Sequence, residues 1–152
     1  MVKQLLELYS ANSCVWEKYG PRIEKEVFDS VRGIINNEFI EQFQKKDGFH
    51  DCLLKNIHII ARNKTVSVRI SIISVDDNEE ISLIFNKCIS VQTHGNLISQ
   101  RIGMISEIIR MHFEVNENGI ITTGILLSTG CIVLIEHVDP NIKCVSIRSL
   151  RG

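Results

Sequence analysis

A histidine directly followed by an aspartate, His50-Asp51, is the pair of residues in this sequence best suited to chemistry. An imidazole beside a carboxylate can act as an oriented general base, or both side chains can bind a metal ion. A metal site needs further ligands, and the sequence has no second His-Asp pair and no His-x-x-x-His spacing. Between a helix and a strand, an aspartate more commonly bonds nearby backbone N–H groups. A structural role is therefore favoured, and catalysis or metal binding by His50 and Asp51 stays open as the alternative.

Two further histidines, His58 and His112, are predicted to lie on polar faces of strands. His58 shares its face with Asn56, and His112 shares its face with Arg110 and Glu114. The two histidines could converge on a metal ion only if their strands were neighbours, which the sequence does not show. Arg110, His112 and Glu114 form a mixed-charge strip, and such a strip suits contact with a protein partner better than it suits catalysis.

The remaining motifs predict neither a cofactor nor a disulfide framework. The sequence has no Gly-x-Gly-x-x-Gly and no Gly-Lys-Ser/Thr, the patterns of dinucleotide and phosphate binding. Its five cysteines are odd in number and never form a Cys-x-x-Cys pair, which disfavours disulfides and zinc binding. We expect them to be buried thiols that pack as small apolar side chains: Cys14, Cys52, Cys88, Cys131 and Cys144.

The residues before Gly48 follow a helical pattern. A short helix is expected over residues 2–12, and Pro21 suits the first turn of a second helix because its missing N–H would be unpaired there anyway. From Pro21 an apolar stripe with a period of 3.6 residues runs for about six turns, as in an amphipathic helix. Gly33 and Asn36-Asn37 could kink or split this helix, and Gly48 is a plausible stop. The stripe consists of Ile23, Val27, Val31, Ile35, Phe39 and Phe43.

From Cys52 onward the apolar period changes from 3.6 to 2, which indicates strands. In the segment 65–74, Val66, Val68 and Ile70 face one way and alternate with polar residues. About seven strands are expected, three before the stretch 94–105 and four after it, with a bulge or strand break near Asn86-Lys87. Because most connections are short, sequential antiparallel pairing is the expected arrangement.

These patterns predict one α+β domain that spans residues 1–152, with a helical part over 1–47 and a β part over 48–152. Amphipathic helices would pack on an antiparallel sheet or a β-roll of about seven strands, because the apolar side of the sheet needs a cover. A chain of 152 residues is long enough to bury roughly two-thirds of its unfolded surface.

Charge and hydropathy exclude several classes of partner. The formal net charge is −1, whereas a dedicated nucleic-acid binder usually carries a strong basic excess. No apolar run approaches the roughly 18–20 residues of a membrane span, so we expect no membrane partner. The residues after Met1 are amphipathic and lack a cleavage site, unlike a signal peptide. A cytoplasmic location is therefore expected.

Phe49-His50-Asp51 and the strands after it resemble a group of small bacterial domains of unknown function, in which Phe/Leu-His-Asp leads into a first strand. The segment 83–91, Leu-Ile-Phe-Asn-Lys-Cys-Ile-Ser-Val, is similar to a third strand in that group. A later block is similar to 125–130, Ile-Leu-Leu-Ser-Thr-Gly. The resemblance covers residues 48–138. Some members look like immunity proteins, which protect a bacterium by binding a toxin, so the resemblance implies protein binding and carries no catalytic residues across.

The leading hypothesis is a non-enzymatic, cytoplasmic protein-binding domain, and its most specific form is an immunity protein that neutralises a cognate toxin. The mixed-charge strip and the stretch 94–105 are the candidate contact regions. A small metal-dependent hydrolase or isomerase that uses His50, Asp51 and His58 is the second hypothesis. A structural subunit that pairs into a homodimer through an exposed sheet edge is the third.

Overall fold

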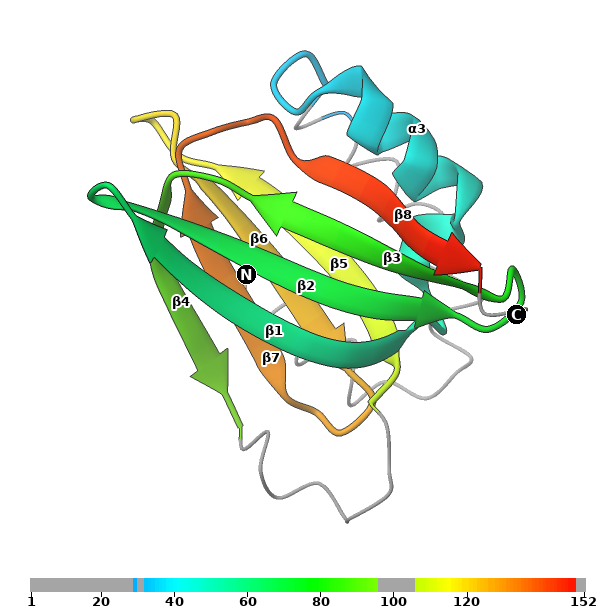
Figure 1. Cartoon of the computed structure of the whole chain (residues 1–152). Coiled ribbons are helices and arrows are strands. Elements are labelled where there is room, and N and C mark those ends of the chain that lie inside the picture. The colour runs from blue at the N-terminus through cyan, green and yellow to red at the C-terminus, as the bar shows by residue number, and fades with distance from the viewer. Residues whose placement is uncertain (1–28, 30–31, 96–105, 150–152) are drawn as a thin grey trace.

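The computed structural model of the chain describes residues 29, 32–95 and 106–149. These residues form one α-helix, one short 3₁₀ turn and eight strands (Figure 1). The helix expected over 2–12 and the first part of the helix expected from Pro21 lie outside the described residues. The elements are α3 (Asn37–Lys45), η1 (Asp47–Phe49), β1 (Leu53–Arg62), β2 (Thr65–Ser74), β3 (Glu79–Phe85), β4 (Cys88–His94), β5 (Ile108–Val115), β6 (Ile121–Leu127), β7 (Ile132–His137) and β8 (Lys143–Ser149).

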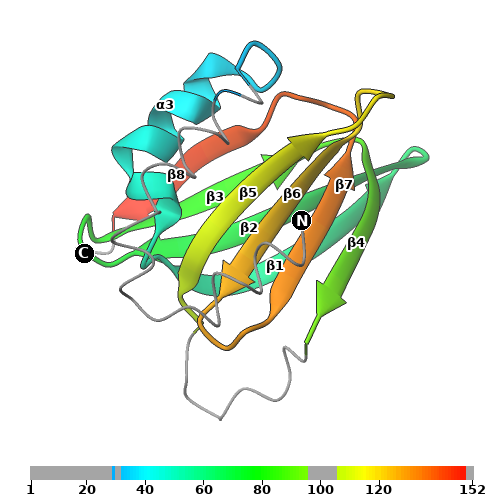
Figure 2. The same ribbon diagram turned by 180° about the vertical axis from the view of Figure 1, so that it is seen from behind.

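The strands form two antiparallel sheets of four strands that face each other (Figures 1 and 2). The strand order is β1-β2-β3-β8 in the first sheet and β4-β7-β6-β5 in the second. The sheets meet at one corner, where Leu53 and Glu107 form an isolated antiparallel bridge. The Leu54 N–H donates there to the Ser106 carbonyl oxygen at 2.8 Å. The mixed α+β class is therefore confirmed. None of the helices in the described ranges is long and apolar enough to cross a membrane.

The predicted strand count and pairing need correction. The break expected near Asn86-Lys87 ends β3, and β4 begins in the other sheet, so four strands precede the stretch 94–105 instead of three. Lys87 has a φ of +52°, which allows the chain to change direction between the sheets. Sequential pairing holds for β1-β2-β3 and β5-β6-β7. It fails at the crossovers, because β8 pairs with β3 and β4 pairs with β7.

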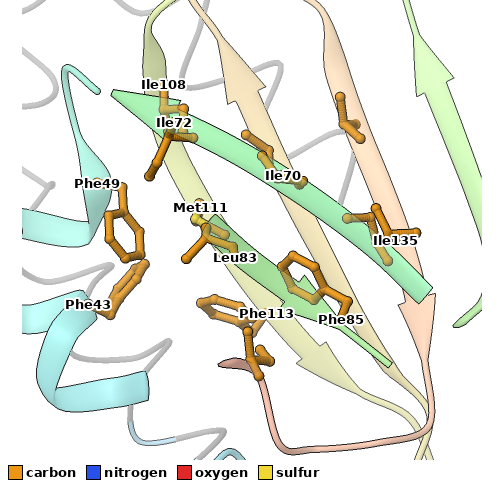
Figure 3. Close-up of a cluster of buried hydrophobic side chains, with 14 of the residues drawn as sticks. Phe43, Phe49, Ile70, Ile72, Leu83, Phe85, Ile108, Met111, Phe113 and Ile135 are labelled. Carbon is orange, nitrogen blue, oxygen red and sulfur yellow. The ribbon is translucent and has the colours of Figure 1, made fainter. Parts of the chain in front are cut away.

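The core lies between the inner faces of the two sheets (Figure 3). The alternation predicted for β2 is confirmed, because Val68, Ile70 and Ile72 are fully buried. Leu83 of β3 is buried beside them, and Phe113 of β5 is buried on the opposite sheet. Burial of large apolar side chains from both sheets is the main favourable contribution to the folding free energy.

Four phenylalanines connect the helix to this core: Phe39 and Phe43 of α3, Phe49 of η1 and Phe113 of β5. Five of their ring pairs have centroids 5.5, 5.7, 5.8, 5.9 and 6.2 Å apart, the range in which aromatic pairs are favourable. We call these residues the phenylalanine cluster. Through it, α3 lies along β8 at an edge of the first sheet, whereas the sequence predicted a helix across an apolar sheet face (Figures 1 and 2).

The long helix predicted from Pro21 is interrupted before α3. Gly33 has a φ of +82°, and residues 32–35 form a turn and a bend. The Asn36 side chain makes two hydrogen bonds to the backbone of Ile142. Its Nδ2 donates to the Ile142 carbonyl oxygen at 3.1 Å, and its Oδ1 accepts from the Ile142 N–H at 2.8 Å. The Asn36 amide is thus held by the loop before β8. The helical stripe is split where the sequence allowed a kink, at Gly33 and Asn36, and a helix of nine residues begins at Asn37.

Candidate partner-binding surface

The segment that contains His50-Asp51 is a left-handed turn between α3 and β1. Asp47, Gly48 and Phe49 have φ values of +51°, +68° and +61°, and Asp51 has +65°. Such angles cost non-glycine residues roughly 1–2 kcal/mol each. At Gly48 an added Cβ would also lie 3.1 Å from Cζ of Phe43. Packing offsets the conformational cost of this turn, because the turn places Phe49 in the phenylalanine cluster with no exposed surface. α3 ends at Lys45, so the chain leaves the helix shortly before Gly48, near the stop that the sequence predicted.

The His50 ring bridges this turn to β5. Its Nδ1 lies 2.8 Å from the Ile109 carbonyl oxygen, so Nδ1 carries the proton and donates. Its Nε2 lies 3.3 Å from Oδ1 of Asp51. The Asp51 backbone N–H donates to the Ile108 carbonyl oxygen at 3.0 Å. These contacts fix the turn against the start of β5 and agree with the structural role that the sequence favours for the pair.

Metal binding by His50 and Asp51 would require further ligands nearby. Within the described ranges, no three His, Cys, Asp or Glu side chains are grouped closely enough to hold a metal ion. His58 is exposed on β1 opposite Arg69, and His112 lies on β5 in the other sheet, opposite Gly124. These two histidines are therefore not brought together in one sheet, and the hydrolase hypothesis stays a prediction.

Replacing His50 by alanine tests its role. We expect His50→Ala to lower the free energy of unfolding by about 1–3 kcal/mol, because the Ile109 carbonyl oxygen loses its donor. Urea denaturation measures the change. His58→Ala is the matched control, and at this exposed position it should stay within about 0.5 kcal/mol of the parent. Metal that copurifies with the parent and is lost in His50→Ala at unchanged stability would contradict the structural role.

The mixed-charge strip lies on one face of β5, but its members are not equally exposed. Arg110 is only 3% exposed, the His112 side chain 15% and the Glu114 side chain 46%. Burial lowers the pKa of His112, and the nearby Glu114 opposes this effect. The strip is therefore only partly exposed to solvent, and partner binding by Arg110, His112 and Glu114 stays a prediction. The stretch 96–105, most of the other candidate region, lies outside the described residues.

β5 contains an irregularity that the sequence does not reveal, just before the strip begins at Arg110. The register between β5 and β6 shifts between Ile108 and Arg110. Ile108 consequently enters the main core, whereas Ile109 packs in a second apolar cluster with Leu126 and Ile132. Strict alternation would place Ile109 on the face of Met111 and Phe113, but the irregularity separates it from them.

The cysteines of the described ranges are free thiols. Cys52 and Cys131 are buried, and Cys88 and Cys144 are partly buried. Burial raises the pKa of Cys52 and that of Cys144 to about 11. Thiols with such raised pKa values are mostly protonated at neutral pH and therefore poor nucleophiles. The prediction that cysteines serve as small packing side chains is confirmed for Cys52 and Cys131.

A polar hollow beside α3 is lined by charged side chains and a thiol. Its volume is 250 Å³, and its lining includes Lys46, Glu79 and Cys144. Lys46 Nζ binds Asp77 at 2.6 Å and also binds Glu79. Burial lowers the pKa of Lys46, but the hydrogen bonds from the two carboxylates outweigh it and raise the pKa overall. The Lys46 ammonium group already has two carboxylate partners. These ion pairs indicate a structural role, in which Lys46 links the end of α3 to the β2–β3 turn.

Exposed apolar side chains mark the side of the molecule where the chain crosses from β3 to β4. Ile59, Ile89 and Val138 are 61%, 55% and 48% exposed. Ile59 lies opposite Val68, and Val68 lies opposite Phe85. The Phe85 carbonyl oxygen accepts from the thiol of Cys88, the residue before Ile89, at 3.3 Å. The Val138 N–H donates to the Lys87 carbonyl oxygen of the same crossover at 3.0 Å. We call Ile59, Ile89 and Val138 the crossover patch.

The patch borders an edge strand with basic neighbours. Among the residues that the structure describes, β1 pairs with β2 alone, apart from the bridge at Leu53. The two-residue turn between β1 and β2 carries exposed Lys64, and Arg62 is exposed next to the turn. Arg69 is exposed further along β2, opposite His58. Sequence reasoning missed this surface. The signal was present, since the segment 52–75 contains four Lys or Arg and no Asp or Glu.

No known protein-family model matches the chain, and no curated protein matches its sequence.

Proposed function

We propose that this chain is a non-enzymatic protein-binding domain. The crossover patch carries the proposal, because two isoleucines and a valine are exposed around the β3–β4 crossover, and exposed apolar groups rimmed by polar residues are typical of protein interaction sites. Exposed polar and basic residues lie near the patch along the chain, namely His58, Arg62 and Lys87. An apolar centre with a polar rim favours a specific protein interface.

The more specific form of this proposal is an immunity protein that blocks a toxin by covering its working surface. The resemblance of residues 48–138 to small bacterial domains supports it. The basic neighbours of the patch favour a partner with an acidic surface, because complementary charges speed association and select the partner.

Affinity capture tests the proposal with the tagged full chain in lysate of its native cells. We expect one stoichiometric protein partner, and we expect Ile89→Asp with Val138→Asp to lower its recovery about tenfold, the effect of removing strong interface contacts. The control is Thr129→Asp, an exposed residue of the β6–β7 turn. Recovery of no partner, or equal recovery by both variants, would overturn the assignment of the patch.

A further inference from the structure

We propose that the free edge of β1 binds an extended, acidic segment of a partner protein by strand addition. The inference rests on the proposed function and specifies how the partner is held. In strand addition, backbone hydrogen bonds supply affinity and alternate side chains supply specificity. Four observations carry it: the length of β1, the direction of its backbone groups, the exposure of its second half and the charge of the β1–β2 hairpin.

β1 is a long edge strand. It contains ten residues, and its pairing with β2 extends to Arg62 opposite Thr65. From His58 to Arg62 the strand is largely exposed, with only Ile60 of intermediate burial. Natural proteins usually shorten or cover such edges, because the unpaired N–H and C=O groups can pair with another chain. A ten-residue edge that stays exposed over half its length therefore has room for a partner strand (Figure 1).

The β1–β2 turn determines which backbone groups face outward. The loop residues Asn63 and Lys64 have φ values of +50° and +63°, as in a two-residue type I′ turn. Such a turn makes the flanking residues a hydrogen-bonded pair, and the pairs alternate from there along the strands. We therefore expect the N–H and C=O of Ile57, Ile59 and Ala61 to point toward the free edge.

The charge of the hairpin selects the partner. All four Lys and Arg residues of the segment 52–75 are exposed, and no acidic residue occurs in it. Lys55 is paired with Glu80 at 2.7 Å, whereas Arg62, Lys64 and Arg69 have no ion-pair partner in the described part of the chain. Pairing β1 with a second copy would bring like charges together, which is destabilising across strands. An acidic segment would instead gain attraction from all three cations.

Peptide binding to the isotope-labelled full chain tests the inference. The probe is a capped ten-residue peptide of alternating Glu and Val, and its control is the same peptide with Lys in place of Glu. Backbone amide signals, followed by NMR, should shift at Ile57, Ile59 and Ala61 with the Glu peptide. The Lys peptide should bind about tenfold more weakly, and added salt should weaken the Glu peptide because exposed charges are screened.

Ile59→Pro is the decisive variant. It removes one outward N–H, and edge strands tolerate proline at such a position because no ladder bond is lost. We expect Ile59→Pro to weaken the Glu peptide about tenfold, whereas Ile59→Thr, which keeps the N–H, should change it by less than about threefold. A melting temperature close to that of Ile59→Thr shows that Ile59→Pro is folded. Equal binding of both peptides, or unchanged binding by Ile59→Pro, would overturn the inference.

Two further outcomes would assign the edge to another occupant. Tighter binding of a single-stranded oligonucleotide than of the Glu peptide would indicate a nucleic-acid surface and overturn the proposal. A doubled mass by light scattering that Ile59→Pro abolishes would indicate a homodimer and also overturn it. If lysate capture by Ile59→Pro still recovers the partner of the parent protein, strand addition fails while the proposed binding function stands.

Discussion

Phe43→Ala should lower the free energy of unfolding by about 3–5 kcal/mol, the usual loss when a buried phenylalanine is truncated. Phe43 is buried and contacts three rings, with centroids 5.9 Å from Phe39, 5.7 Å from Phe49 and 5.5 Å from Phe113. Its removal would leave a cavity where α3, η1 and β5 meet. Gly48 packs on the same ring, so the left-handed turn would lose support as well.

Urea denaturation measures this loss, provided that the slope of the free energy of unfolding against urea concentration is the same in both proteins. Ile89→Ala is the control, because it removes an exposed side chain and should cost at most about 0.5 kcal/mol. Phe43→Leu keeps most of the volume and should fall between the two. A loss below about 1 kcal/mol for Phe43→Ala would mean that the site collapses without a cavity, and that α3 contributes little to the core.

Acidification should destabilise the fold through His137. This side chain is fully buried, with Nδ1 donating to the Asp139 carbonyl oxygen at 2.9 Å and Nε2 accepting from Thr123 Oγ1 at 2.9 Å. Burial lowers its pKa below the ordinary 6.5, although the Asp139 carbonyl and carboxylate oppose this. Below pH about 6.5 the unfolded chain therefore binds a proton that the folded chain does not, so stability falls as the pH falls further.

Urea midpoints at pH about 7.5 and about 5.5 measure this dependence. His137→Leu should be less stable at both values, because the Thr123 hydroxyl loses its acceptor, but its midpoint should change less with pH. His58→Leu, at an exposed position, should keep the dependence of the parent. The pKa of His112 is also lowered by burial, so a smaller dependence should remain in His137→Leu. An equal dependence in His137→Leu and the parent would contradict this role of His137.

The strand patterns were readable from sequence because side-chain alternation is local. The apolar row of β2 and the break near Lys87 both follow from period-two alternation and its interruption. The candidate site was less predictable. His50-Asp51 was visible as a pair, but the carbonyl oxygen that holds its ring belongs to Ile109, 59 residues away. The strip on β5 was drawn correctly on one face, yet the shift at Ile108–Arg110 depends on the register with β6.

The pattern of neighbouring residues along the sequence was enough to predict an α+β protein, with a helix that stops near Gly48 and antiparallel strands after it. Backbone conformation and amphipathic period act over a few residues, and neighbouring side chains carry that information. Tertiary structure alone decided that β3 pairs with β8 and that the Asn36 side chain bonds Ile142, 106 residues away, just before α3 begins. Such contacts depend on which surfaces pack together when the two sheets enclose one core. Short sequence patterns contain no information about that packing.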